Sequence, residues 1–286
     1  MVKSGTVLRA LSSFFYVQID NEVIECRASK KLKINQKIIV GDNVQVDLEE
    51  NYITLINPRT SELKRPLIAN VSNAFIVLSV KEPKLDFNLL DKMITLMEYN
   101  KLKLNIIITK VDLLNQEELK EIKSKLNYYE QIGYNILYSS IDSDIKQITS
   151  LLENDRYVIT GQSGVGKSTL LNRIIPDLNL QTQNISNALG RGKHTTREVT
   201  FYAYKDSYLI DTPGFSSLDL DMEPEEVRDN FVDFYSLSKD CKFSTCFHDQ
   251  EPGCNVKNNL ENILETRYKN YLNLLSKSKD GKWKKY

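Results

Sequence analysis

Eight consecutive residues, 161–168, have the residue types and the spacing that bind phosphate groups. They read Gly-Gln-Ser-Gly-Val-Gly-Lys-Ser and lie between an apolar segment, residues 156–160, and a helix-forming segment, residues 169–175. A strand, a glycine-rich loop and a helix in this order distinguish a phosphate-binding loop from a chance turn. The glycines let main-chain amides face the phosphates at the positive end of the helix. We expect nucleotide contacts from Gly161, Gln162, Ser163, Gly164, Val165, Gly166, Lys167, Ser168 and Thr169.

Two of these side chains predict chemistry as well as binding. Lys167 should reach the β- and γ-phosphates, and Ser168 should offer its hydroxyl to Mg²⁺. The loop alone does not discriminate between ATP and GTP.

A second motif, Thr109-Lys110-Val111-Asp112, supplies that discrimination. The Asp112 carboxylate can accept hydrogen bonds from guanine N1–H and from the exocyclic amino group, whereas adenine presents no such donor pair. The stem of Lys110 would lie against the base, and Thr109 stands where asparagine is more usual. Ser139 and Ser140 follow a predicted strand and form either a second guanine-contacting loop or a plain turn.

A third motif, Asp211-Thr212-Pro213-Gly214, follows an apolar strand. Asp211 would hold Mg²⁺ through water, and the Gly214 amide would meet the γ-phosphate. Between the two phosphate motifs lies a basic loop, residues 190–197, in which either Thr195 or Thr196 should complete the Mg²⁺ shell while GTP is bound.

Phe215 stands where many GTPases have the glutamine that orients the attacking water. Because phenylalanine cannot bind water, we expect His194 to take this role, which places His194, Lys167 and Thr196 in the catalytic set. The alternative is that His194 contacts RNA or solvent.

The order of these motifs is itself informative. In ordinary GTPases the phosphate loop precedes the base-reading motif, whereas here Asp112 precedes Lys167. Domain termini commonly lie close together, so joining the old ends and cutting one loop preserves the sheet. The sequence therefore predicts a circularly permuted α/β GTPase domain.

A metal site is predicted near the C-terminus by the pattern Cys-x4-Cys-x-His-x5-Cys. Three thiolates and one imidazole suit tetrahedral Zn²⁺, and four protein ligands make such a site structural. Its ligands are Cys241, Cys246, His248 and Cys254. Cys26 stands apart and is expected in a core.

The remaining sequence supplies the scaffold. Short β-rich segments at residues 5–9, 14–19, 23–27, 37–40, 44–47 and 52–56 predict a small barrel of the OB type, followed by a linker at 58–66. From residue 71, apolar segments alternate with helical ones, which indicates a mostly parallel sheet. Helices are expected from Pro224 and over 259–276, and then a lysine-rich tail around Trp283 that is either solvated or an RNA contact.

Composition narrows the class of protein. The chain has 38 basic and 38 acidic residues, so no global charge indicates a nucleic-acid partner. Its apolar segments are far shorter than the roughly 18 residues of a membrane span, and we expect a cytoplasmic protein.

In the order and number of these motifs the chain closely resembles the RsgA (YjeQ) family of circularly permuted GTPases that act in maturation of the small ribosomal subunit. The resemblance covers essentially the whole length and implies GTP hydrolysis stimulated by the 30S subunit, with the barrel and the zinc unit contacting 16S rRNA. It implies GTP or GDP, Mg²⁺ and one structural Zn²⁺ as ligands, with no DNA or membrane partner and a monomeric state.

We expect three domains: an OB-fold RNA-binding domain over residues 1–66, the permuted GTPase over 67–220 and a zinc-binding helical domain over 221–286. The alternative function is a nucleotide-gated RNA- or protein-binding signalling GTPase that does not act on the ribosome.

Overall fold

The computed structural model describes residues 1–11, 13–29, 32, 37–64, 66–178, 199–212 and 222–280. The chain divides into two compact units that do not follow chain order. Unit 1 comprises Met1–Asn73, Leu152–Ile159 and Gly192–Pro213, and unit 2 comprises Ala74–Leu151, Thr160–Arg191 and Gly214–Tyr286. The three-domain division expected from sequence stays a prediction.

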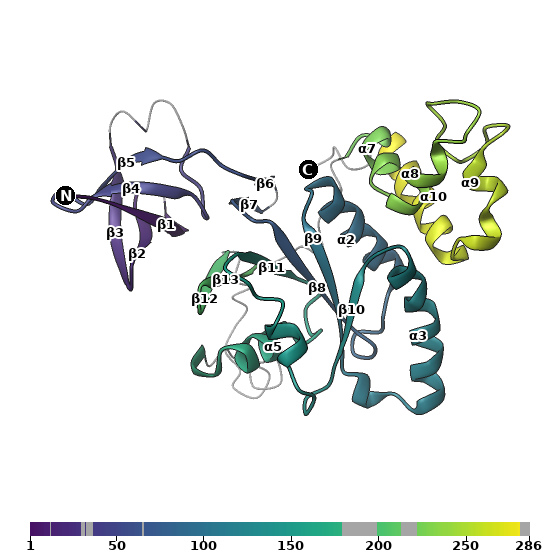
Figure 1. Ribbon diagram of the computed structural model, residues 1–286, viewed down its shortest axis with the longest axis horizontal. Helices are drawn as coiled ribbons and strands as arrows, with labels where there is room; N and C mark the ends of the chain where they lie inside the picture. The colour runs from purple at the N-terminus through teal and green to yellow at the C-terminus, as the bar shows by residue number, and fades with distance from the viewer. Residues whose placement is uncertain are drawn as a thin grey trace. The chain divides into compact units, whose positions relative to one another are not determined.

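Unit 1 contains a closed five-stranded barrel with strand order β1-β2-β3-β5-β4 (Figure 1). Its strands are β1 (Val2–Ala10), β2 (Phe15–Ile19), β3 (Glu22–Ala28), β4 (Asn43–Asp47) and β5 (Tyr52–Ile56). Strand β3 pairs with β5 in parallel, while β1 closes the barrel by pairing antiparallel with β4. Alternate residues such as Val44 and Val46 point inward and are fully buried, as expected for a strand with one solvated face. The OB-type barrel is thereby confirmed.

One predicted barrel strand, residues 37–40, is wrong. Ile38 and Ile39 are buried, yet of this segment only Val40 forms an isolated bridge, to Ile68. Side chains satisfy part of the main chain: the Ile39 amide donates to Asp42, and Arg59 donates to the Lys37 carbonyl. The carbonyls of Ile39 and Val40 accept from the amides of Asp42 and Ala69. The apolar run therefore reflects packing, not a sheet ladder.

The predicted linker at 58–66 also differs, because it contains a strand. Strand β6 (Glu62–Lys64) pairs antiparallel with β7 (Leu67–Ala69). Arg59 lies just before β6 and holds the buried Asp42 carboxylate through two hydrogen bonds, at 2.7 and 3.0 Å. This stretch is thus structured and fastened to the barrel.

The predicted mostly parallel sheet is present, with strand order β10-β9-β8-β11-β13-β12. Its strands are β8 (Asn73–Ser79), β9 (Lys103–Thr109), β10 (Asn135–Ser139), β11 (Arg156–Thr160), β12 (Thr200–Tyr204) and β13 (Ser207–Asp211). Strands β9 and β10 pair in parallel, as do β11 and β13, whereas β12 is antiparallel to β13. Strand β8 is buried along its whole length, as parallel strands covered on both faces are.

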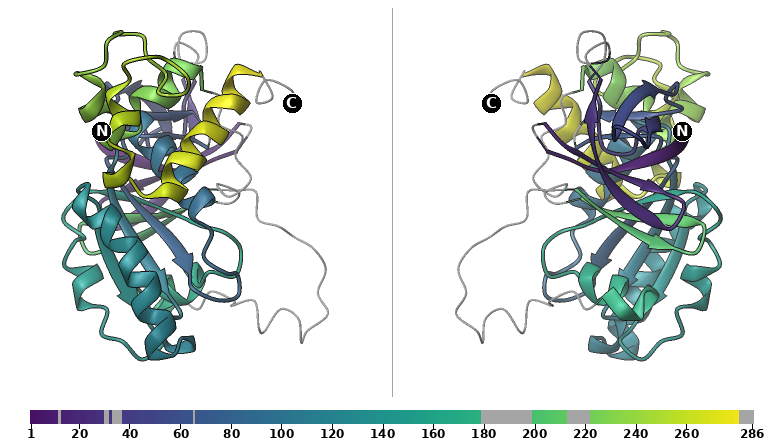
Figure 2. Two further views of the ribbon diagram at one scale, coloured as in Figure 1. Left: turned by 90° about the vertical axis from the view of Figure 1, so that its right-hand side faces the viewer. Right: turned by 90° about the vertical axis from the view of Figure 1, so that its left-hand side faces the viewer.

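Helices cover the part of the sheet that belongs to unit 2. Helices α2 (Phe87–Tyr99) and α3 (Gln116–Gln131) lie on one side of β8, β9 and β10, and α5 (Lys167–Ile174) lies on the other (Figure 1). In the left view of Figure 2, α3 lies in front of these strands. The helix predicted over 144–152 is the single turn α4 (Lys146–Thr149). Helix α3 begins with a capping box formed by Asn115 and Glu118, which fixes its first turn.

The C-terminal helices are more broken than the sequence predicts. The helix expected from Pro224 is split into α7 (Pro224–Asp229) and α8 (Val232–Ser238), and the one expected over 259–276 begins only at α10 (Glu265–Lys279), after the short α9 (Asn255–Asn258). Phe231, at the break, is fully buried and packs against Phe234 and Tyr271, with ring centroids 5.3 and 5.0 Å away. Core packing at this position overrides helix continuity.

Across the described residues, no helix is both long and apolar enough to span a bilayer.

Candidate functional site

The phosphate loop occupies the expected turn between β11 and α5. A Cβ built on Gly161 would lie 2.1 Å from the Val77 carbonyl oxygen, so no other residue fits there. Gly166 has φ of +96° and stands at the N-cap of α5, where it contributes no capping side chain. A helix N-terminus reached through a glycine turn is the geometry that binds an anion.

The Lys167 ammonium group lies over this loop. Its Nζ donates to the carbonyl oxygens of Gly161 at 2.6 Å and Gln162 at 2.8 Å. A bound nucleotide would offer anionic phosphate oxygens in place of these neutral acceptors, which adds the attraction between opposite charges to hydrogen bonds that the ammonium group already makes.

We therefore expect the Lys167→Met variant to hydrolyse GTP about 10²- to 10³-fold more slowly, the loss seen when one preorganised donor to a transition state is removed. Single-turnover phosphate release would measure it. Lys125→Met is the control, because Lys125 lies on α3 and forms an exposed pair with Glu121, at 2.7 Å. Equal rates for the two variants would exclude Lys167 from catalysis.

Thr109 joins the base-reading motif to the phosphate loop. It is buried at the end of β9, and its hydroxyl donates to the Val165 carbonyl at 2.6 Å, with the Leu78 carbonyl 3.2 Å from the same oxygen. By its residue type, Thr109 departs from the asparagine that is more usual at this position of the motif. In the structure this side chain brings the two motifs into direct contact.

The residues after Thr109 form a short exposed turn. Lys110 adopts a left-handed conformation with φ of 58°, and its Nζ donates to the Glu82 carbonyl. Asp112 lies within a 3₁₀ turn, Val111–Leu113, and is exposed to solvent. Lys81, which sequence reasoning missed, donates to the Leu113 carbonyl and to Glu118, both at 3.0 Å, and so fixes the end of this turn.

Ser139 and Ser140 lie where the sequence places them, at the end of β10. Ser139 is buried and is the parallel register partner of Thr109. The Ser140 amide donates to the hydroxyl of Ser143 at 3.0 Å, which closes the following turn. Arg173 of α5 reaches the same turn. Both loops that follow β9 and β10 are thus connected to the segment that contains the phosphate loop.

The third motif is described in part. Asp211 ends β13 as the parallel partner of Ile159, and the Thr212 hydroxyl donates to the Ile159 carbonyl at 3.2 Å. The predicted contacts from His194, Thr195, Thr196 and Gly214 lie outside the described residues.

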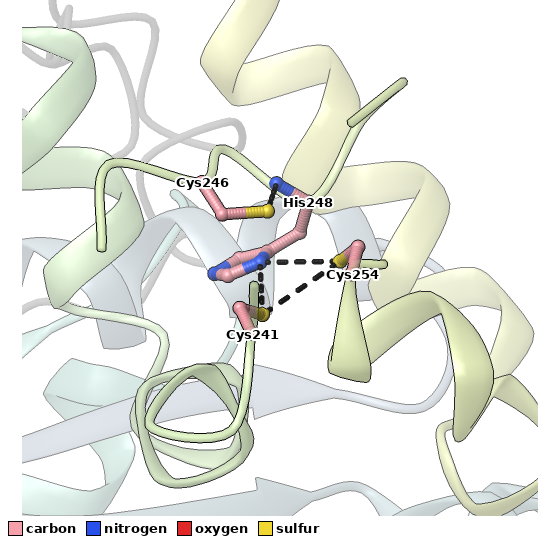
Figure 3. A group of neighbouring side chains, drawn as sticks. All are labelled: Cys241, Cys246, His248 and Cys254. Carbon is pink, nitrogen blue, oxygen red and sulfur yellow. Dashed lines mark hydrogen bonds between the residues drawn. The ribbon is translucent and has the colours of Figure 1, made fainter. Parts of the chain in front are cut away.

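The predicted zinc ligands do come together (Figure 3). One ligand atom from each residue lies within 4.8 Å of all the others, and all four cysteines of the chain are free thiols. His248 Nδ1 lies 3.5 Å from the sulfur of Cys254 and 3.7 Å from that of Cys241, and these two sulfurs are 4.0 Å apart. The cluster comprises Cys241, Cys246, His248 and Cys254.

These distances fit a tetrahedral zinc ion. With ordinary Zn–S and Zn–N bond lengths, tetrahedral ligands are separated by roughly 3.8 Å for two sulfurs and roughly 3.6 Å for sulfur and nitrogen. Main-chain amides also face the sulfurs: Asn255 donates to Cys241 at 3.2 Å, His248 to Cys246 at 3.4 Å and Lys257 to Cys254 at 3.5 Å. Donors of this kind stabilise thiolates, the form that binds metal.

Burial disfavours the charged forms of these side chains when no cation is bound. It raises the pKa of the Cys246 thiol to about 12, raises the pKa of Cys254, and lowers the pKa of the His248 imidazole. Three clustered thiolates therefore need a cation, and the residues present fit Zn²⁺.

Helix α10 supports the cluster of three cysteines and His248. The Tyr268 hydroxyl donates to the His248 carbonyl, and the Tyr271 hydroxyl donates to the Phe247 carbonyl, both at 2.7 Å. The Glu251 carboxylate accepts from the amides of Phe247 and Asp249, at 2.9 and 3.0 Å, and shapes the turn that follows His248. The loop is thus held by its own hydrogen bonds as well as by its ligands.

A phosphate loop, a guanine-type motif placed before it in the chain and bonded to it, and an α/β sheet define a circularly permuted GTPase. Comparison with protein families gives the same class: the RsgA GTPase model matches residues 51–221, and the RsgA N-terminal domain model matches residues 4–56. The chain belongs to the RsgA GTPase family.

Relatives and solved structures agree over nearly the full length. The small ribosomal subunit biogenesis GTPase RsgA of Shouchella clausii is 42% identical, with 97% of this chain and 98% of the relative covered. Its counterpart in Halalkalibacterium halodurans is 44% identical, with 96% and 97% covered. The structure is similar to YjeQ from Thermotoga maritima, with a TM-score of 0.83, 31% identity and 97% and 99% of the chains covered. It is also similar to YloQ, a circularly permuted GTPase, with a TM-score of 0.80, 34% identity and 98% and 96% covered.

Proposed function

We propose that the chain hydrolyses GTP in the biogenesis of the small ribosomal subunit, and that binding to this subunit stimulates the hydrolysis. The observation that carries the nucleotide part is the hydrogen bond from Thr109 to Val165, which unites the guanine motif with the phosphate loop. The ribosomal part is supported by relatives that are named small ribosomal subunit biogenesis GTPases and match over nearly all of their length.

The direct test compares phosphate release from GTP by the chain alone, with purified 30S subunits and with purified 50S subunits. Basal turnover should be slow, because missing water-positioning and charge-stabilising groups are worth roughly 10³ to 10⁵ in rate. Strong stimulation by 30S alone supports the proposal. Equal rates in all three conditions would favour the alternative, a nucleotide-gated RNA- or protein-binding signalling GTPase that does not act on the ribosome.

We assign the nucleotide contacts as the sequence suggests. Lys167 holds the β- and γ-phosphates, while Asp112 and Lys110 hold the guanine. Bound Mg²⁺ would neutralise phosphate charge, and the hydroxyl of Ser168, the Asp211 carboxylate and the hydroxyl of Thr195 or Thr196 are placed in the sequence to hold it. Gly214 would meet the γ-phosphate through its amide.

We infer that His194 orients the attacking water, because Phe215 cannot. The His194→Ala variant should then have a turnover number lower by about 10²-fold with nearly unchanged GTP affinity, a split that isolates an effect on the chemical step. Stopped-flow binding and single-turnover hydrolysis measure the two quantities. The role is rejected if affinity and turnover fall equally, or if turnover does not change.

The remaining assignments concern partners and the switch. We infer a structural Zn²⁺ in the Cys241 cluster, contacts of the barrel and the zinc-binding segment with 16S rRNA, and a monomeric protein that acts in the cytoplasm. GTP would order the loop around Thr195 and the segment after Asp211, and so favour the subunit-binding state. Equal affinity of the GDP-bound and GTP-analogue-bound chain for 30S subunits would contradict this switch, because a ligand shifts a state only through differential binding.

A further inference from the structure

Arg173 joins helix α5 to the turn that follows β10. Its Nη1 donates to the Ser140 carbonyl at 2.7 Å and lies 3.4 Å from the Ser139 hydroxyl, while Nη2 donates to the Ser143 carbonyl. One guanidinium group therefore contacts both ends of the turn 140–143. The planar fork of arginine suits this task, because it presents several donors in a fixed geometry.

The helix and the turn that Arg173 joins have different roles in the site. Helix α5 begins with Lys167, directly after the phosphate loop. The turn 140–143 follows β10, where Ser139 is the register partner of Thr109 at the end of β9. Arg173 thus connects the phosphate-binding helix to the candidate base-contacting turn, as Thr109 connects the phosphate loop to the other base-side segment.

Within the part of the chain that the structure describes, little else anchors the tip of this turn. Ile141 has 67% of its surface exposed, so apolar packing does not hold it. Within the turn, the Ser143 hydroxyl donates to the Ser140 carbonyl at 2.9 Å and accepts from the Ser140 amide at 3.0 Å. These bonds fix the shape of the turn but not its position, and its position relative to α5 is given by the bonds from Arg173.

We propose that Arg173 is a positioning residue for guanine recognition, which holds the turn 140–143 at the distance from the phosphate loop that a guanine nucleotide requires. The proposal rests on the proposed function and on the sequence-based expectation that Ser139 and Ser140 form the second guanine-contacting loop. It makes Arg173 a determinant of base preference although the residue belongs to the phosphate-binding helix.

The test separates base binding from phosphate binding. Dissociation constants would be measured for GDP, ADP and Mg²⁺-pyrophosphate with the wild-type chain, Arg173→Met, Arg173→Lys and the control Lys125→Met. Loss of charged hydrogen bonds should weaken GDP binding by about 10-fold or more in Arg173→Met and narrow the preference for GDP over ADP by the same factor. Pyrophosphate affinity should stay unchanged, and Arg173→Lys should be intermediate because an ammonium group cannot span both carbonyls.

Other outcomes would overturn either the role of Arg173 or the proposed function itself. If GDP and pyrophosphate affinities fall together, Arg173 supports the fold of the phosphate loop and not the base turn. An unchanged preference for GDP over ADP also overturns it. A wild-type chain without any preference for GDP would instead refute the proposed function. Should Arg173→Met not fold, Ser143→Ala carries the test, with a smaller loss of the same preference expected because it loosens the turn while leaving Arg173 in place.

Discussion

Removal of the metal from the purified chain is expected to unfold the segment around Cys241 to Cys254. Metal binding contributes about 10–16 kcal/mol to the folding of small structural zinc sites, more than the few kcal/mol that the short helix α9 and its loop could supply alone. Cys246→Ser should have the same effect, because the remaining buried ligands no longer form a tetrahedral set. Metal analysis, circular dichroism and limited proteolysis measure the loss: one zinc per chain becomes none, and cleavage appears near this loop.

A matched cysteine distinguishes loss of the metal from loss of any thiol. Cys26 is buried in the barrel core and is remote in sequence from the cluster. Cys26→Ala should keep the zinc content at one and the protease resistance of the C-terminal segment. A metal-free chain that resists proteolysis as the native chain does would show that the cluster does not depend on zinc.

Replacing Arg267 with methionine is expected to cost about 3–5 kcal/mol of stability, because it leaves buried carboxylates without their counter-ion. Arg267 on α10 is fully buried and binds Asp91 of α2 and Asp233 of α8, each with contacts at 2.7 Å. Tyr129 and Asn270 donate to the same Asp91, at 2.9 and 2.6 Å. This network holds α10 against α2, a helix that covers the parallel sheet. Helix α10 in turn contacts the loop around His248. Denaturant unfolding and hydrogen exchange of α2 and α10 would measure the loss.

The pKa shifts of Arg267 and Asp91 show why removal of the arginine should be costly. Burial by itself lowers the pKa of the Arg267 guanidinium, but Asp91 and Asp233 raise it well above its usual value. Burial raises the pKa of Asp91, and Arg267, Asn270 and Tyr129 oppose that rise. The arginine is therefore charged, and its removal leaves Asp91 and Asp233 buried without their cationic partner.

The control for this prediction replaces all three charges. Because a buried ion pair exchanged for apolar side chains is often neutral or stabilising, the triple variant Arg267→Met, Asp91→Leu and Asp233→Leu should recover much of the stability lost in Arg267→Met alone. If Arg267→Met is as stable as the native chain, the network does not hold α10 to α2 and α8.

The sequence predicts best where local pattern and chemistry coincide. Helix α2 over Phe87–Tyr99 and strand β10 over Asn135–Ser139 have the expected bounds, since an apolar period and flanking turn residues both mark their ends. The Cys241 cluster is equally predictable from the sequence, because a metal site requires particular residue types at short spacing.

Side chains that act over long sequence distances carry no such signal. Arg173, Arg267 and Lys81 are ordinary basic residues in the sequence, and their partners lie far from them along the chain. The prediction of a strand over 37–40 fails for a related reason. Ile38 and Ile39 are apolar because they are buried, and local pattern does not reveal that Asp42 and Arg59 bind their main chain.

The most direct measurement for the whole account is the nucleotide preference of the Asp112→Asn variant. Xanthine has a carbonyl where guanine has its exocyclic amino group, so an asparagine amide can donate where the aspartate accepted. If Asp112 and Lys167 belong to one guanine-nucleotide site, kcat/KM for GTP should fall about 10²-fold or more while the variant gains hydrolysis of XTP. An unchanged preference for GTP over XTP would contradict the account.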